Sequence, residues 1–223
     1  VLNNHIGILV NSSLANDIYQ NYVIDTHYGI YILNSRENKI SNNAIVASAR
    51  GGGGAGVVFA LSSGNIFQAN LVKDSVNAGI ALTSSYDNTI YYNNFINNRY
   101  QSSVYPKDYA NVWNAQYPQG GNFWSGYSGP DVYKGPYQNE TGSDGIGDIP
   151  YMISYPYNKD GYPYLREIVV FHDVAVKSVI PSASKVYEGQ TVDINVKVTN
   201  TGNYTETFIA TVYYDTTIIE SRT

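Results

Sequence analysis

The 223-residue chain contains no cysteine, few charged residues and no long apolar run. The lack of cysteine excludes disulfides, thiol catalysis and thiolate metal sites. Its 13 basic and 18 acidic side chains give a net charge of −5, without the basic patch typical of nucleic-acid binding. No apolar segment approaches the ~18–20 residues that a membrane-spanning helix needs. We therefore expect neither a nucleic-acid partner nor a membrane span in this segment.

Helical apolar periodicity is also missing, whereas asparagine, tyrosine and glycine are abundant. The sequence contains 25 Asn, 23 Tyr and 20 Gly residues. Asparagine and glycine form helices poorly and turns readily, and tyrosine favours strands. The composition predicts an all-β protein, and the length allows one large β domain or two small ones.

Four copies of one repeat make up the first hundred residues. Alignment on Gly7, Gly29, Gly56 and Gly79 gives spacings of 22, 27 and 23 residues, the longest caused by a glycine-rich insertion near residues 50–54. Hydrophobic residues recur one, three, eleven and sixteen positions after each glycine, and serine recurs six positions after it. Asparagine recurs nine and fourteen positions after it, giving the columns Asn16, Asn38, Asn65, Asn88 and Asn21, Asn43, Asn70, Asn93.

A repeat of about 22 residues predicts a parallel β-solenoid, in which each coil contains three short strands. Coils then stack at the ~4.8 Å spacing of paired strands, and equivalent side chains form ladders. Asparagine amides at the turns are expected to bond to the asparagines above and below. Residues 1–4 match residues 95–98, so we expect the chain to begin inside a coil.

This pattern of glycine, serine, asparagine and hydrophobic positions resembles the right-handed parallel β-helix repeats of the NosD / carbohydrate-binding-and-sugar-hydrolase group. The resemblance covers about residues 1–104. It implies a right-handed parallel β-helix. It leaves the function open, because the group includes pectin-degrading enzymes, periplasmic proteins of copper enzyme assembly and surface proteins of archaea and bacteria.

The composition changes after residue 104. Seven of the eight prolines, both tryptophans and 11 of the 23 tyrosines lie between residues 105 and 166, without a regular period. We interpret residues 105–166 as a loop-rich aromatic cap over the open end of the β-helix. The segment is similar to the one that ends the β-helix in many archaeal surface proteins.

Four aspartates of this segment lie in loops rich in glycine and asparagine: Asp131, Asp144, Asp148 and Asp160. Oxygen ligands on such loops suit Ca²⁺, although the spacing is not that of an EF-hand. Aspartates also cap turns by bonding to nearby backbone amides. Calcium is the cofactor that these aspartates propose, and turn capping remains the alternative.

Residues 167–223 are expected to form a separate, immunoglobulin-like domain. Val192, Ile194, Val196 and Val198 alternate with polar residues, as in a half-buried antiparallel strand. The runs at residues 173–176, 188–190 and 196–202 resemble the start of a CARDB-type domain, an adhesion-related module of prokaryotic surface proteins. A complete sandwich needs about seven strands and ~100 residues. We therefore expect the missing strands to come from a longer chain or from a neighbouring protein.

Candidate catalytic acids recur at matching coil positions. Glu37 and Asp87 form one pair and Asp25 and Asp74 another, each two coils and therefore ~10 Å apart. An inverting glycosidase pair needs ~6.5–9.5 Å and a retaining pair less, so solvated turn acids are the alternative interpretation.

Histidines and tyrosines give further candidates. His5 and His27 should stack ~5 Å apart in adjacent coils, either as a metal-sharing pair or as an ordinary turn ladder. Tyr91, Tyr92 and Tyr100 are candidates for stacking on sugar rings, with core or cap packing as the alternative. Three Asn-x-Ser/Thr sequons mark candidate glycosylation sites at Asn11, Asn139 and Asn203.

The sequence favours a non-catalytic extracellular protein of the cell surface, acting as a spacer, adhesin, surface-layer or filament component. A polysaccharide-acting β-helix enzyme, either a lyase or a glycoside hydrolase, is one alternative. A carbohydrate-binding module without turnover is another. The expected partners are neighbouring copies, other surface proteins or polysaccharide.

Overall fold

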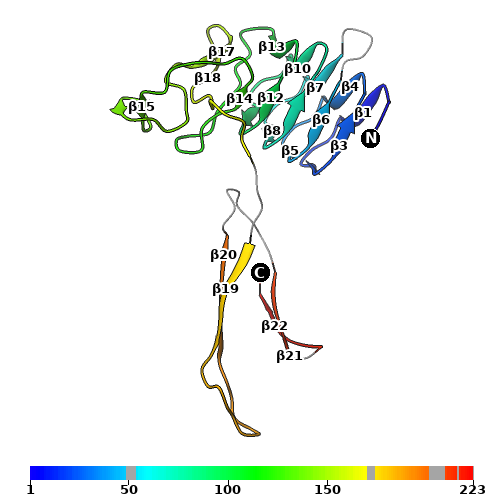
Figure 1. Cartoon of the computed structure of the whole chain (residues 1–223). Coiled ribbons are helices and arrows are strands. Elements are labelled where there is room, and N and C mark those ends of the chain that lie inside the picture. The colour runs from blue at the N-terminus through cyan, green and yellow to red at the C-terminus, as the bar shows by residue number, and fades with distance from the viewer. Residues whose placement is uncertain (49–53, 170–173, 201–208, 215, 223) are drawn as a thin grey trace. The chain divides into compact units, whose positions relative to one another are not determined.

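Strands and irregular loops account for all described residues of the computed structural model, which are 1–48, 54–169, 174–200, 209–214 and 216–222 (Figure 1). The chain divides into two units, residues 1–168 and 169–223. No helix in these described ranges is long and apolar enough to cross a membrane. The all-β fold class is thus confirmed.

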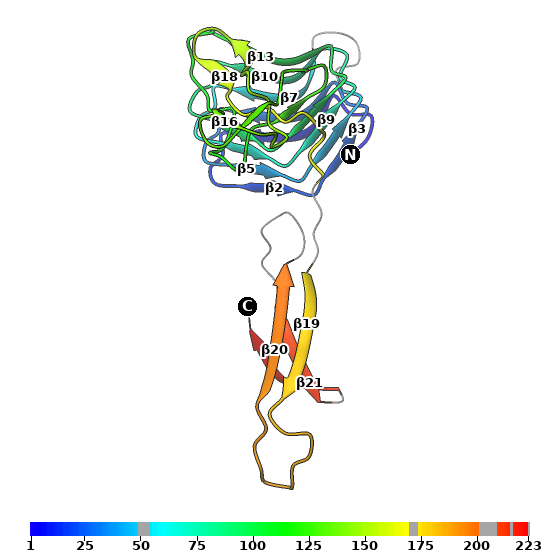
Figure 2. The ribbon, with the colours of Figure 1, turned by 60° about the vertical axis from the view of Figure 1, so that its left-hand side comes forward.

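Three walls of parallel strands build the first unit (Figures 1 and 2). The first wall contains, in spatial order, β1 (Ile6–Asn11), β4 (Tyr28–Leu33), β7 (Ala55–Ala60), β10 (Ala78–Thr83) and β13 (Tyr100–Tyr105). The second contains β2 (Asp17–Tyr19), β5 (Lys39–Ser41), β8 (Ile66–Gln68) and β11 (Thr89–Tyr91). The third contains β3 (Tyr22–Ile24), β6 (Ala44–Val46), β9 (Leu71–Lys73), β12 (Asn94–Ile96) and β14 (Phe123–Trp124). This arrangement confirms the parallel β-solenoid.

The strand register places equivalent residues of the repeat at the same position in successive coils. Ile30 of β4 pairs with Ile8 of β1 and with Val57 of β7, which in turn pairs with Ile80 of β10. The inward-facing residues of the inner coils are fully buried, and each contributes about 1.5–3 kcal/mol through the hydrophobic effect. The core is therefore a set of aliphatic and aromatic ladders between the three walls.

The repeat glycines stack inside the first wall, where they allow close approach of neighbouring coils. A Cβ atom on Gly56 would lie 2.7 Å from the carbonyl oxygen of Gly79 and 2.7 Å from Cγ1 of Val72. No real Cβ tolerates such contacts, so the residue is required for space. Along this four-residue glycine column, neighbouring coils leave no space for a side chain.

Two ladders of asparagine side chains run along the coils. Asn43 illustrates the bonding: its backbone N–H and its Nδ2 both donate to Oδ1 of Asn70, at 2.9 Å each, and Nδ2 also donates to two backbone carbonyls. The left-handed turn residue is the one before each inner asparagine, for example Asn42 with φ 56° and Ala69 with φ 54°. The asparagines are thus used for their amides rather than for a left-handed backbone.

The ladders continue beyond residue 104, where the sequence repeat was no longer recognised. Asn88 donates to Oδ1 of Asn111, and Asn93 donates to Oδ1 of Asn122, at 2.9–3.1 Å. β14 pairs with β12, and a single parallel bridge joins Val112 to Thr89. Residues 100–124 therefore contribute a fifth, partial coil.

A hairpin ends both ladders. β17 (Tyr151–Ser154) pairs antiparallel with β18 (Asn158–Asp160), and Asn158 and Asp160 are fully buried. Asn158 Oδ1 accepts from Asn111 N at 3.1 Å, and Asp160 Oδ2 accepts from Asn122 N at 2.7 Å. The ladder amides of the last coil consequently find acceptors within residues 105–166. The interpretation of residues 105–166 as a cap stays a prediction.

Aromatic rings extend the core toward the same hairpin. Trp124 stacks on Phe95 with ring centroids 4.5 Å apart, and Tyr151 stacks on Trp124 at 4.6 Å. Trp113 is fully buried beside them. A further small hairpin pairs β15 (Tyr133–Lys134) with β16 (Glu140–Thr141). The large rings replace the aliphatic ladders where the regular coils end.

The second unit consists of two antiparallel pairs. β19 (Val174–Pro181) pairs with β20 (Ile194–Asn200), and β21 (Ala210–Tyr214) pairs with β22 (Thr217–Arg222). Each pair is a separate two-stranded sheet. The immunoglobulin-like, CARDB-type assignment of this unit stays a prediction.

Candidate functional site

A groove is hollowed into the outer face of the first wall, with a volume of about 470 Å³. We call it the wall groove. Its floor consists of small side chains on the two central strands, Ala55 and Val58 on β7 and Ala78 and Ala81 on β10. Tyrosines and serines on the flanking strands β4 and β13 line its sides, and Gly54, Asn77 and Thr83 also contribute to the lining. The wall groove therefore crosses four successive coils.

Strand register explains why the face is hollow at this place. Tyr28 pairs with Ala55, Ala55 with Ala78, and Ala78 with Tyr100. The outward-facing row thus reads large, small, small, large, and the tyrosines rise on both sides of an alanine floor. At the strand spacing of ~4.8 Å, the two outer strands of the row lie ~14 Å apart.

The tyrosines of the wall groove are held by their neighbours. The ring of Tyr28 meets that of Tyr31 edge to face, with centroids 5.2 Å apart, and contacts His27 in the same manner at 4.6 Å. Tyr100 is 54% exposed, and the guanidinium of Arg99 lies 5.5 Å from its ring centroid. One end of the groove therefore has two half-buried aromatic rings, and the other end has one accessible ring.

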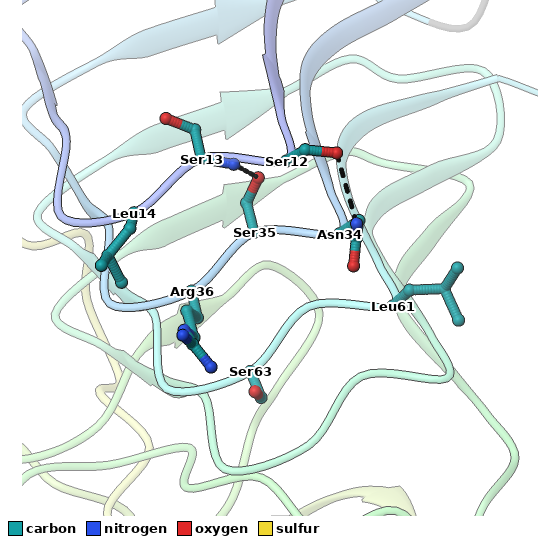
Figure 3. Close-up of a pocket in the computed structure, with 8 residues that line it drawn as sticks. All are labelled: Ser12, Ser13, Leu14, Asn34, Ser35, Arg36, Leu61 and Ser63. Atoms are coloured by element: carbon teal, nitrogen blue, oxygen red, sulfur yellow. Dashed lines mark hydrogen bonds between the residues drawn. The ribbon is translucent and has the colours of Figure 1, made fainter.

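A second groove, of about 320 Å³, lies at the turn that follows the first wall (Figure 3). Serines form much of its lining, but they are engaged in the fold: Ser35 Oγ accepts from Ser13 N at 3.0 Å and donates to the carbonyl of Leu33 at 2.7 Å. Asn34 Nδ2 donates to Ser12 Oγ at 3.2 Å. Arg36 is the charged residue of the lining. The main group that this turn groove offers to a ligand is therefore the guanidinium of Arg36.

The candidate catalytic acids all lie at left-handed turn positions. Their φ values are 58° for Glu37, 54° for Asp87, 63° for Asp25 and 58° for Asp74. Asp74 lies 3.7 Å from the ammonium of Lys73, and both side chains are substantially exposed. None of the four lines the wall groove or the turn groove. Their placement fits the interpretation as solvated turn acids.

Three of the four candidate calcium ligands bond to loop groups near them. Asp131 accepts hydrogen bonds from Ser143 Oγ at 2.6 Å and from the backbone of Asp144 and Gly145 at 3.0 Å each. Burial raises the pKa of Asp131, but the three hydrogen bonds together lower the pKa by more than burial raises it. The pKa of Asp131 therefore lies below its ordinary value. These bonds match the turn-capping alternative, and the lowered pKa favours the ionised form of Asp131.

The other two loop aspartates behave alike. Asp144 accepts from Gln138 Nε2 at 3.0 Å, and Asp148 accepts from Val132 N at 2.9 Å. Such bonds match turn capping, the alternative that the sequence left open. Among the described residues, no group of three or more His, Cys, Asp or Glu side chains is placed to hold a metal ion. Calcium binding stays a prediction.

Asp160 has a different environment, at the end of an asparagine ladder. It accepts from Asn122 N at 2.7 Å, from Trp124 Nε1 at 2.8 Å and from Tyr162 N at 3.0 Å. Burial raises its pKa to about 6, although these hydrogen bonds act in the opposite direction. Backbone, amide and indole donors engage both oxygens of Asp160, and a calcium ligand at this position stays a prediction.

Comparison with known families assigns the solenoid to one of them. The family described as "Periplasmic copper-binding protein (NosD)" matches residues 1–129, more than half of the chain. The chain belongs to the NosD family. No curated protein matches it. The family's description indicates a periplasmic or surface protein, located outside the cytoplasm.

The copper binding in the NosD description finds no matching ligand set in the described residues. His5 and His27 stack with centroids 4.8 Å apart and ring planes at 10°. Imidazole nitrogens bind a metal within the plane of the ring, so two parallel rings direct their nitrogens along separate planes instead of toward one ion. The chain has no cysteine, and Met152 is its single methionine. These residues do not supply a copper ligand set, and the stacked rings match the turn-ladder interpretation of the histidine pair.

The structure places the candidate tyrosines and the glycosylation candidates in different environments. Tyr91 bonds through its hydroxyl to Gln68 and Tyr92 packs against Tyr164 at 5.9 Å, whereas Tyr100 lines the wall groove. Asn11, at the end of β1, and Asn139, between β15 and β16, are both exposed, while Asn203 lies outside the described residues. The sequence did not single out Tyr28 and Tyr31. Their position before and after a repeat glycine was the available signal.

Proposed function

We propose that this NosD-family protein is a non-catalytic structural or adhesion protein of the cell surface, in which the β-helix is a stiff scaffold. The observation that carries the proposal is the use of the repeated polar side chains. Asn38, Asn65 and Asn88 are buried, and the Nδ2 group of each donates a hydrogen bond to an asparagine of the next coil. These repeated asparagines therefore hold neighbouring coils together.

The ladders also favour a spacer or scaffold on energetic grounds. A typical intramolecular hydrogen bond adds only about 0.5–1.5 kcal/mol, but an unsatisfied buried polar group costs about 1–3 kcal/mol. Sliding or separating two coils would break several ladder bonds together. A NosD solenoid of this kind resists local opening and suits a load-bearing or display role.

The test compares turnover with assembly. The purified chain is incubated with polygalacturonate, xylan, mannan and cellulose, and reducing ends and unsaturated uronates are measured. We expect no product above the buffer blank, and we expect filaments, lattices or envelope-bound protein by electron microscopy. Asp87→Asn and Glu37→Gln serve as matched variants. Product release that is lost in either variant would show an enzyme and overturn the proposal.

A further inference from the structure

We propose that the wall groove binds a single-chain anionic amphiphile, a fatty acid or an alkyl phosphate, with its alkyl chain lying across the coils. This inference goes beyond the proposed scaffold function, which needs no ligand. It starts from the outer face of the first wall, where a second hydrophobic cluster lies apart from the main core. The cluster consists of the buried residues Ala55, Val58, Ala60 and Ala78, with Tyr28, Tyr31, Leu33 and Ala81 packed against them.

The shape of the wall groove fits one extended alkyl chain. The paired positions Tyr28, Ala55, Ala78 and Tyr100 place a tyrosine on either side of an alanine floor. The outer strands of this row lie ~14 Å apart, which is the length of an extended chain of about ten carbon atoms joined by ~1.5 Å bonds. Each methylene that the floor removes from water adds to the binding free energy.

Arg99 supplies the charge that an anionic head group needs. Its guanidinium lies 5.5 Å from the ring centroid of Tyr100, the tyrosine at the β13 end of the groove. Arg99 is exposed, and within the described part of the chain no acidic side chain forms an ion pair with it. None of the described residues that line the groove is Lys, Arg, Asp or Glu. The groove is thus an uncharged trough with a cation beside its β13 end.

The trough and the cation together select among ligand classes. A guanidinium pairs with a carboxylate or a phosphate through the same planar, two-pronged geometry, so both head groups suit this end. Thr83 and Ser103 also line the groove but are exposed, so their hydroxyls stay hydrated when a chain covers the floor. An extended peptide gains most from an open strand edge, whereas the floor strands β7 and β10 are paired on both sides. An alkyl chain with one terminal negative charge is the class that fits.

The experiment titrates the full chain by calorimetry with octanoate, decanoate and decyl phosphate, each below its critical micelle concentration. Decanol and decyltrimethylammonium are the uncharged and cationic probes with the same alkyl chain. Decanoate should bind about three to ten times more tightly than octanoate, because two further methylenes are buried. It should bind about fivefold more tightly than decanol, and the cationic probe should bind no more tightly than decanol. The carboxylate and phosphate arms show which head group the site prefers.

Substitutions test the cation and the floor separately. Arg99→Gln should lower the affinity for decanoate about fivefold and leave the affinity for decanol unchanged, whereas a merely structural role would change both. Arg36→Gln is the matched control, because Arg36 is also exposed but lines the turn groove, and it should change neither affinity. Ala81→Phe fills the half-buried floor and should abolish binding of both probes.

Thermal unfolding of each variant separates lost binding from lost folding. Val58→Thr is a milder floor variant, because threonine also favours strands but places a hydroxyl in the floor, and it should weaken decanoate binding about threefold. The inference is overturned if no alkyl anion binds, if decanol binds as tightly as decanoate, or if Ala81→Phe keeps the wild-type affinity. Tighter binding of a leucine-rich peptide with a free carboxyl terminus would assign the groove to a protein partner and also overturn it. These results leave the scaffold proposal intact, since that proposal fails only on catalytic turnover.

Discussion

At the scale of single residues, Asp160 shows how one side chain can serve a ladder at an electrostatic cost. Its carboxylate receives the last amides of the Asn122 ladder and the indole N–H of Trp124. Every one of these contacts is a donor, which suits an ionised acceptor, yet the site is fully buried. The fold therefore gains hydrogen bonds and loses hydration of a charge at the same atom.

The raised pKa of Asp160 predicts a pH-dependent stability. The folded-state pKa of about 6 exceeds the ordinary 3.8, so the folded protein binds this proton more tightly than the unfolded chain. The contribution of Asp160 to the unfolding free energy is therefore greatest below about pH 4 and falls as pH rises through 6. The total loss is on the order of 3 kcal/mol.

Urea unfolding of the wild type and of Asp160→Asn at pH 4, 5, 6 and 7 isolates this term (about three pH units suffice to span both pKa values). The asparagine places an N–H group against Tyr162 N–H and loses that hydrogen bond, but it carries no buried charge. We expect the variant to gain stability relative to the wild type as pH rises. A difference that is constant over this range would contradict the raised pKa.

At the scale of elements, the asparagine ladders join each coil to the next. An asparagine in the middle of a ladder, such as Asn70, makes more hydrogen bonds than one at the end of a ladder. Asn70 Oδ1 accepts from Asn43, and its Nδ2 donates to Asn93 and to the carbonyls of Ile40 and Gln68. Asn16, in the first coil, is only half-buried and has fewer bonds.

We predict that Asn70→Ala lowers the unfolding free energy by about 3 kcal/mol or more, because it leaves several buried polar groups without partners. Asn16→Ala, the matched control with the same chemical change, should cost about 1 kcal/mol. Chemical unfolding followed by circular dichroism measures both. Equal losses at the two positions would show that the ladder does not distribute its stabilisation according to burial.

The sequence was sufficient to predict the regular coils, since the glycine, serine and asparagine columns report a period directly. It did not reveal the fifth coil, where long loops stretch the spacing from Asn93 to Asn122. A signal was present, because Asn111-Val112-Trp113 and Asn122-Phe123-Trp124 repeat the asparagine followed two residues later by a hydrophobic residue. The acceptor role of Asp160 was not predictable, because it depends on a distant hairpin reaching the ladder.

The wall groove, too, could not be predicted from any single repeat. Each alanine and tyrosine of the lining is unremarkable in its own repeat. The hollow appears only when the register sets Tyr28, Ala55, Ala78 and Tyr100 side by side across four coils. Comparing the size of outward-facing residues between aligned repeats, rather than their identity, is the sequence test that would have found it.

At the scale of the whole molecule, the two units satisfy their strands differently. In residues 1–168 the inner strands of each wall are paired on both sides. In the described part of residues 169–223 each sheet has two strands, so every strand there is an edge. Unpaired edges with exposed apolar residues, such as Val176 at 64% and Ile180 at 60%, favour addition of further strands. We propose neighbouring copies or other surface proteins as their source.

This proposal predicts that the 223-residue chain associates through its second unit. Light scattering coupled to size exclusion should show a mass that rises with protein concentration. Lysine at an edge blocks strand addition, so Val176→Lys combined with Ile180→Lys should keep the chain monomeric. Tyr22→Lys, an equally exposed change on the third wall, should associate like the wild type. The unfolding transition of residues 1–168 should be the same in all three proteins, because the substitutions to lysine lie outside its core. A monomer at every concentration in the wild type, or undiminished association in the double variant, would show that these edges are protected by some other means.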